Sequence, residues 1–84
     1  MNKRPSPTAL RARILGLRWR RAHAAMHVLA ADSIAAQTEF LGADGIARMR
    51  ATDYQIETAE ALREIEHQLR RCRRALNHLK EYRA

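Results

Sequence analysis

Several residue types that usually direct a fold or a site are scarce in this chain of 84 residues. It contains one cysteine, three glycines, two prolines and four aromatic residues. The single cysteine, Cys72, excludes an intramolecular disulfide and a zinc site built from several cysteines, and it fits a reducing compartment. We therefore expect a cytoplasmic protein. The rest of the composition is rich in Ala and Arg, which favours helices over sheet.

Long apolar runs are absent as well. The longest weakly polar stretch, residues 22–36, is interrupted by His23, His27, Asp32 and Ser33. A membrane-spanning helix needs about 18 or more consecutive apolar residues. Arginines interrupt the residues that follow the basic start, which argues against a secretory signal. The sequence therefore predicts a protein without a membrane span.

Motifs for catalysis are also missing. The sequence has no constellation of a nucleophile and a base, and Gly42 and Gly45 form a turn rather than a phosphate-binding loop. His23 and His27 stand one helical turn apart, a spacing that can hold a metal, but the sequence places no third ligand beside them. We interpret them as ordinary helix histidines. The expectation is a protein that is not an enzyme and has no cofactor or metal site.

Acidic residues are missing from the first 21 positions, where seven residues are Lys or Arg. Residues 22–69 hold eight acids and three Arg, and residues 70–84 hold six bases and one acid, so the three segments carry charges of +7, −5 and +5. If the chain folds back on itself as a helical hairpin, both basic segments lie at the same end. Concentrated charge of one sign repels itself, and it implies an anionic partner.

Helical periodicity, by contrast, is strong. Ser6 followed by Pro7 is typical of a helix start, and the pattern that follows predicts one helix from about Pro7 to Leu41. Apolar and small residues recur at alternating spacings of three and four, as in a helix that packs along another. This first stripe consists of Ala12, Leu15, Trp19, Ala22, Met26, Leu29, Ser33, Ala36 and Phe40. We expect the first stripe to pack on the second helix.

A turn at residues 42–45 separates the two predicted helices. Gly42 suits the left-handed position that follows a helix, and Asp44 can cap the next one. The second helix either starts at Gly45 or breaks and restarts near Asp53, because residues 52–55 have the form of a capping box. In the second case, a short helix lies between the two long ones.

The predicted fold is an all-α antiparallel helical hairpin. With the turn at residues 42–45, the numbers of facing residues add to about 87, which puts Trp19 near Leu69 and Leu15 near Cys72. We expect a basic disordered tail over residues 1–6 and a single hairpin domain over residues 7–84.

A second apolar stripe runs beside the first. It consists of Leu10, Ile14, Leu17, Ala24, Val28, Ala31 and Ala35. A helix with two apolar stripes usually contacts more than one neighbour, so we expect the second stripe to be the seam of a homo-oligomer, with a dimer forming a helical bundle as the simplest case. The alternative is a solvent-exposed stripe, since alanine on a surface helix costs little.

The basic end supplies the candidate binding residues. They are Arg11, Arg13, Arg18, Arg20, Arg21, Arg70, Arg71, Arg73, Arg74 and Lys80. Arginine can bind carboxylates and phosphates through paired hydrogen bonds, so an acidic protein surface, a nucleic acid and a merely solvated face are three open readings. Few aromatic residues are present, and Trp19 is expected in the seam, which argues against stacking of single-stranded bases.

Among these readings, we favour a non-enzymatic regulatory or adaptor protein. It would dock through the basic end and an apolar helix stripe onto another protein and modulate it, by inhibition in the simplest case. Binding of RNA or DNA through the same end is the alternative.

Overall fold

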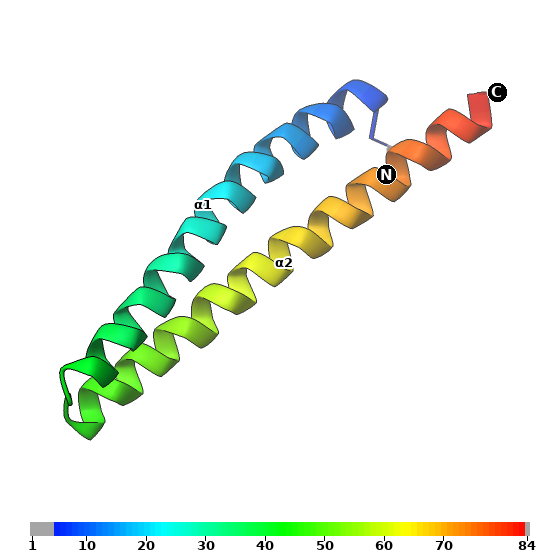
Figure 1. The fold of residues 1–84 in the computed structure, drawn as a ribbon. Coiled ribbons are helices and arrows are strands. Elements are labelled where there is room, and N and C mark those ends of the chain that lie inside the picture. The colour runs from blue at the N-terminus through cyan, green and yellow to red at the C-terminus, as the bar shows by residue number, and fades with distance from the viewer. Residues whose placement is uncertain (1–4, 84) are drawn as a thin grey trace.

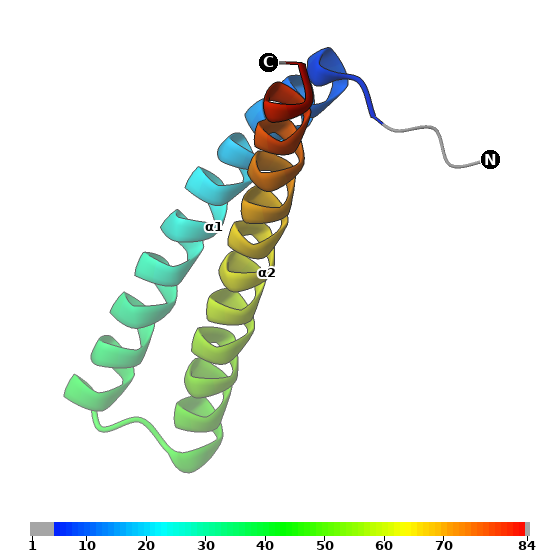
Figure 2. The same cartoon turned by 90° about the vertical axis from the view of Figure 1, so that its right-hand side faces the viewer.

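The computed structural model consists of two long antiparallel helices, α1 (Pro7–Phe40) and α2 (Gly45–Arg83) (Figure 1). The structure describes residues 5–83, with side chains as far as Lys80, so most of the predicted tail lies outside the described residues. The molecule is a rod of 60 × 22 × 16 Å. The start of α1 and the end of α2 lie at the same end of the rod (Figures 1 and 2). The predicted all-α antiparallel hairpin is confirmed.

Local hydrogen bonds set both ends of α1. The Ser6 hydroxyl oxygen accepts the backbone N–H of Ala9 at 3.1 Å, and Pro7 occupies the first helical position, where a missing N–H costs nothing. At the other end, Gly42 adopts a φ of 64°, and its N–H donates to the carbonyl of Glu39 at 3.1 Å. The helix therefore ends at Phe40, one residue earlier than predicted, and Leu41 caps it.

Replacing Gly42 with alanine is expected to lower the free energy of unfolding by about 1–2 kcal/mol, because a Cβ atom disfavours the left-handed conformation. Nothing lies within 4 Å of the position that this Cβ would take, so backbone conformation and not a clash causes the loss. Urea unfolding measures it. Gly45→Ala is the matched control, since Gly45 has no positive φ and equally open surroundings. An equal loss in both variants would contradict the assigned role of Gly42.

The start of α2 settles the choice between the two predicted starts. The Asp44 carboxylate accepts the N–H of Ala47 at 2.8 Å, which caps a helix beginning at Gly45. The helix continues without a break through Asp53. The Thr52 hydroxyl donates to the Arg48 carbonyl at 3.0 Å, one turn back, so Thr52 lies inside the helix and does not cap a new one. The restart near Asp53 and the short intervening helix are therefore wrong.

The seam between the helices contains the second stripe and not the first. The buried α1 residues are Leu10, Leu17, Ala24 and Ala31, and the buried α2 residues are Ala51, Thr58, Leu69 and Cys72. Ile14, Val28 and Ala35 are half-buried on the same side of α1. Every member of the predicted oligomer seam thus packs within its own chain, and that assignment is corrected.

Side-chain size explains why the second stripe faces α2. Only residues 41–44 join the helices, so the helix axes must approach closely near the turn. Toward the turn the second stripe offers Ala31 and Ala35, whereas the first includes Leu29 and Phe40 beside the smaller Ser33 and Ala36. Small residues allow helices to approach closely. The bulkier Leu17, Leu69 and Cys72 form a cluster nearer the open end, with Ile14 and Ile65 packed against them.

The predicted register holds even though the stripe is different. The Gln55 side-chain amide donates to the Asp32 carboxylate at 2.9 Å, and Leu17 lies in the same buried cluster as Leu69. Both pairs lie close to the predicted sum of residue numbers. Leu17 takes the place beside Leu69 that Trp19 was expected to have.

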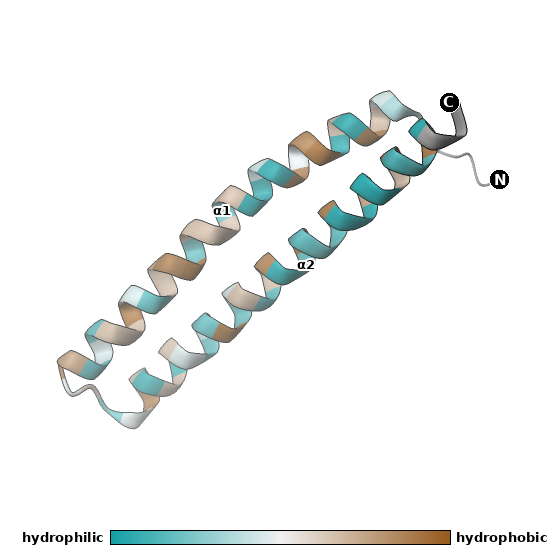
Figure 3. Ribbon diagram, turned by 45° about the vertical axis from the view of Figure 1, so that its right-hand side comes forward, coloured by the Kyte–Doolittle hydropathy of each residue, from teal (hydrophilic) through white to brown (hydrophobic). Residues whose placement is uncertain are grey.

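The two helices differ in polarity. α1 carries hydrophobic residues around much of its circumference, whereas α2 is mainly hydrophilic away from α1 (Figure 3). A single neighbouring helix can bury the apolar side of a helix that is apolar on one side only, but α1 is apolar on more than one side. The hairpin therefore leaves part of α1 uncovered.

Candidate docking surface

The ten predicted binding residues come together in the half of the rod that is farther from the turn. Five lie in the first half of α1 and five in the second half of α2 (Figure 1). All of them are exposed except Arg21, which is half-buried because it occupies a seam position. The hairpin thus creates a strongly cationic end from two segments that are far apart in the sequence.

The arginines of α1 are divided between two sides of the helix. Arg13 and Arg20 are seven residues apart and lie beside the seam on one side, and Arg11 and Arg18 lie on the other. Arg13 and Arg20 line hollows between the helices, together with Gln68 and Arg71 of α2. The cationic end therefore has a side with a groove and a side without one.

The groove has an apolar section about midway along the rod. This hollow has a volume of about 530 Å³. Its lining residues are Trp19, Arg20, His23, Ala24, His27, Tyr54, Glu57, Thr58, Ala61 and Ile65. The Tyr54 hydroxyl lies 3.3 Å from Nδ1 of His27, so a hydrogen bond joins the two helices here. Small side chains at Ala24, Thr58 and Ala61 leave the space that larger residues would fill.

An arginine section continues the groove toward the open end. A hollow of about 260 Å³ shares Arg20 with the apolar section and is also lined by Arg13, Leu17 and Gln68. The next hollow, of about 220 Å³, shares Arg13 and Gln68 with it and adds Arg71. These shared residues join the three hollows into one line, which we call the docking groove. It passes from aromatic and imidazole side chains to guanidinium groups.

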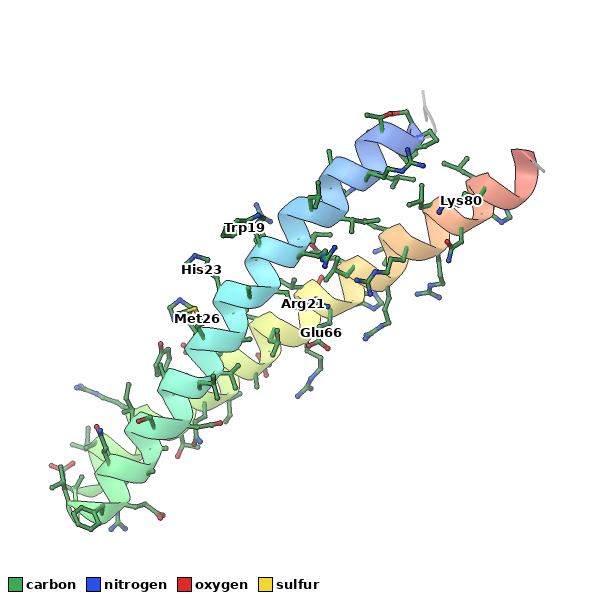
Figure 4. The ribbon with its side chains drawn as sticks, turned by 45° about the horizontal axis from the view of Figure 1, so that its top comes forward. Trp19, Arg21, His23, Met26, Glu66 and Lys80 are labelled. Carbon is green, nitrogen blue, oxygen red and sulfur yellow. The ribbon has the colours of Figure 1, made fainter. Side chains whose placement is uncertain are left out.

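The first stripe forms a separate exposed surface on α1. Its large members are Leu15, Trp19, Met26, Leu29 and Phe40, which are 59%, 73%, 66%, 69% and 90% exposed. Figure 4 shows Trp19 and Met26 projecting from α1 away from α2, with His23 between them. We call this surface, from Ala12 to Phe40, the outer face of α1. Trp19 is common to the outer face and the rim of the docking groove.

Cys72 borders the arginine section but is buried among Leu17 and Leu69. We expect a thiol reagent to label it at least about tenfold more slowly in the folded protein than in denaturant, because the sulfur must first become accessible. Mass spectrometry over a time course measures both rates. Equal rates would contradict its burial.

Neither a metal centre nor a membrane span is found in the described part of the chain. Within it, no three His, Cys, Asp or Glu side chains are grouped so that they could hold a metal ion. Likewise, neither helix has a stretch long and apolar enough to cross a bilayer.

Sequence reasoning found the cationic end but not the docking groove. The missed residues include Tyr54, Thr58 and Ile65 of α2, which no motif marks. A signal was present in the register, which places the small residues Ala24 and Ala61 opposite each other and so predicts a hollow.

No protein-family model matches the chain, and neither a curated protein nor a solved structure is significantly similar to it.

Proposed function

We propose that this chain is a non-enzymatic regulatory or adaptor protein that binds an acidic segment of another protein and modulates it, with inhibition as the simplest outcome. The observation that supports this proposal is the continuity of the docking groove. Its apolar section can receive a bulky side chain, while Arg13, Arg20 and Arg71 can bind neighbouring carboxylates. Trp, Tyr and Arg are the residue types that contribute most to binding at protein interfaces.

The proposal includes a homodimer in the cytoplasm. A two-helix hairpin of this length has a small core, and self-association would bury further apolar surface. The single free thiol, Cys72, fits a reducing compartment.

Nucleic-acid binding is the second candidate, and the exposure of Trp19 favours it. The spacing of the first stripe predicted that this side chain packs in the seam between the helices. In the structure it is 73% exposed, and the exposed Arg18 and Arg20 flank it. An exposed aromatic ring beside cationic side chains can stack on an unpaired base. The apolar section of the groove has no role in this alternative, which is why we rank it second.

Fluorescence anisotropy of labelled probes discriminates the two candidates. The probes are an acidic peptide of Asp and Glu with one central Phe, the same peptide with Ser for Phe, and single- and double-stranded oligonucleotides. We expect the Phe peptide to bind most tightly and to lose little affinity as salt rises, because its apolar contact is not screened. Tighter binding of an oligonucleotide at physiological salt, with a steep log-linear salt dependence, would reverse the ranking.

Charge reversal localises the binding. Arg13→Glu combined with Arg20→Glu is expected to reduce affinity for the Phe peptide at least about tenfold, because the acidic residues would then meet like charge. Arg70→Glu combined with Arg74→Glu is the matched control. It changes the net charge equally, but neither residue lines the docking groove. An equal loss in both double variants would indicate nonspecific attraction to the cationic end.

A further inference from the structure

The outer face of α1 has the dimensions of a helix-packing surface. Its members keep the alternating three and four spacing from Ala12 to Phe40, which corresponds to about 42 Å of helix. With a helix width of about 10 Å, two such faces would cover roughly 800 Å² of footprint, and interdigitating side chains increase the buried area. Specific dimers begin near about 1,000 Å², so this surface lies at the lower limit and fits a weak, concentration-dependent dimer.

Charge along one edge of the outer face selects the occupant. Every seventh residue along this edge belongs to the series Arg11, Arg18, Ala25, Asp32 and Glu39, so the edge is basic at one end and acidic at the other. An identical helix running antiparallel brings Arg11 against Glu39 and Arg18 against Asp32, with a two-fold axis near Ala25. In a parallel copy this edge instead faces the opposite edge of the outer face, residues 16, 23, 30 and 37, which carries no Asp, Glu, Lys or Arg, so these ion pairs are lost.

The side chains on this edge are available for such pairs. Arg11, Arg18, Asp32 and Glu39 are all exposed. One oxygen of Asp32 accepts a hydrogen bond from Gln55 of the same chain, which orients the carboxylate and leaves its second oxygen free of that bond. Ala25, at the proposed axis, is small enough for the two helices to approach closely.

Side-chain size also fits the antiparallel arrangement. With the axis near Ala25, Leu15 of one copy lies between Ser33 and Ala36 of the other, and Phe40 lies beside Ala12. A large residue facing small ones lets side chains interdigitate, as in knobs-into-holes packing. A parallel copy in register would instead place Trp19 against Trp19 and Phe40 against Phe40.

We propose that the outer face of α1 is covered by the outer face of α1 of a second copy, antiparallel, about a two-fold axis near Ala25. This inference rests on the homodimer in the proposed function and assigns its surface and orientation. The α1 helices lie at the centre of the dimer, and the mainly hydrophilic α2 helices lie outside. The arginine section of the groove lies on the other side of α1, so the dimer presents two docking grooves, one toward each end.

Sedimentation equilibrium over a range of protein concentrations tests the surface. Leu29→Glu places a charge in the centre of the outer face, and we expect the dissociation constant of the dimer to rise at least about tenfold. Ile56→Glu is the matched control, because Ile56 is 51% exposed on α2 and lies outside the proposed contact. It is expected to leave the dissociation constant unchanged. Circular dichroism checks that both variants remain helical.

Cysteine cross-linking tests the orientation. Arg18→Cys protein is mixed with Asp32→Cys protein and oxidised, and the linked peptides are identified by mass spectrometry. We expect mixed links between positions 18 and 32. A parallel dimer would not give these mixed links, because positions 18 and 32 would lie about 21 Å apart along the helix axes. Absence of mixed links in a protein that sediments as a dimer would overturn the antiparallel arrangement.

The outcomes separate this inference from the proposed function. A chain that stays monomeric at all concentrations overturns both the outer-face pairing and the homodimer. A stable oligomer that Leu29→Glu does not weaken overturns the outer face as its contact and leaves the homodimer standing. Binding of the Phe peptide is measured in the Leu29→Glu variant as well, because residue 29 does not line the docking groove. Retained binding there shows that docking does not depend on the pairing.

Discussion

Shortening Leu69 to alanine is expected to lower the free energy of unfolding by about 2–5 kcal/mol. Leu69 is only 1% exposed and is the largest fully buried side chain of the described residues. It lies in a cluster with Leu17 and Cys72, and the other buried apolar residues are Leu10 and alanines. Because so few large side chains form the core, losing one removes much of the stability of a small domain, which is typically about 5–15 kcal/mol.

Urea unfolding at a fixed protein concentration measures this loss. The concentration is held constant because self-association would add to the apparent stability. Met49→Ala is the matched control: it removes a side chain of similar size that is 61% exposed on α2. We expect a change within about 0.5 kcal/mol for the control. Similar losses in the two variants would mean that the cluster around Leu69 does not determine stability.

Those parts of the fold that depend on local chemistry could be predicted from the sequence. Ser6, Gly42 and Asp44 each act through a backbone conformation or a hydrogen bond within a few residues. Their effect is therefore the same whatever the helices pack against. The length of the turn then determines the antiparallel register, which the contact between Asp32 and Gln55 confirms.

The choice between two apolar stripes could not be made from periodicity. Both stripes of α1 follow helical spacing, although Arg21 interrupts the second between Leu17 and Ala24, so each is compatible with a helical seam. The uninterrupted spacing of the first stripe, from Ala12 to Phe40, predicts that it packs on the second helix. The short turn overrides this spacing, because it brings the helix axes close together near the turn and favours a small residue such as Ala31 there.

The candidate site, too, could be predicted from the sequence only in part. Charge position along the chain predicted that ten basic residues gather at one end, because a hairpin brings the two ends of the chain together. Charge position alone could not assign Arg13 and Arg20 to the docking groove, since this depends on which side of α1 faces α2. Once the seam is known, helical geometry places Arg11 and Arg18 on the opposite side.

Enlarging Ala31 to leucine is the converse test of the seam and is expected to lower the free energy of unfolding by about 1–3 kcal/mol. Ala31 is 0% exposed, and the buried α2 residues toward the turn, Ala51 and Thr58, are also small. The added carbons therefore have no cavity to enter and must separate the helices. The four residues that join α1 to α2 limit how far they can separate.

The matched control for this variant is the neighbouring residue. Ala30→Leu adds the same atoms one position along α1, where the side chain is exposed, so we expect a change within about 0.5 kcal/mol in urea unfolding. Equal stability of the two variants would mean that the helices are not closely packed near the turn. In that case, the argument that the short turn selects the alanine stripe would fail, and the first stripe could return to the seam. A large difference instead requires the alanine stripe to face α2, and it thereby leaves Leu15, Met26 and Leu29 on the outside, available for a second copy.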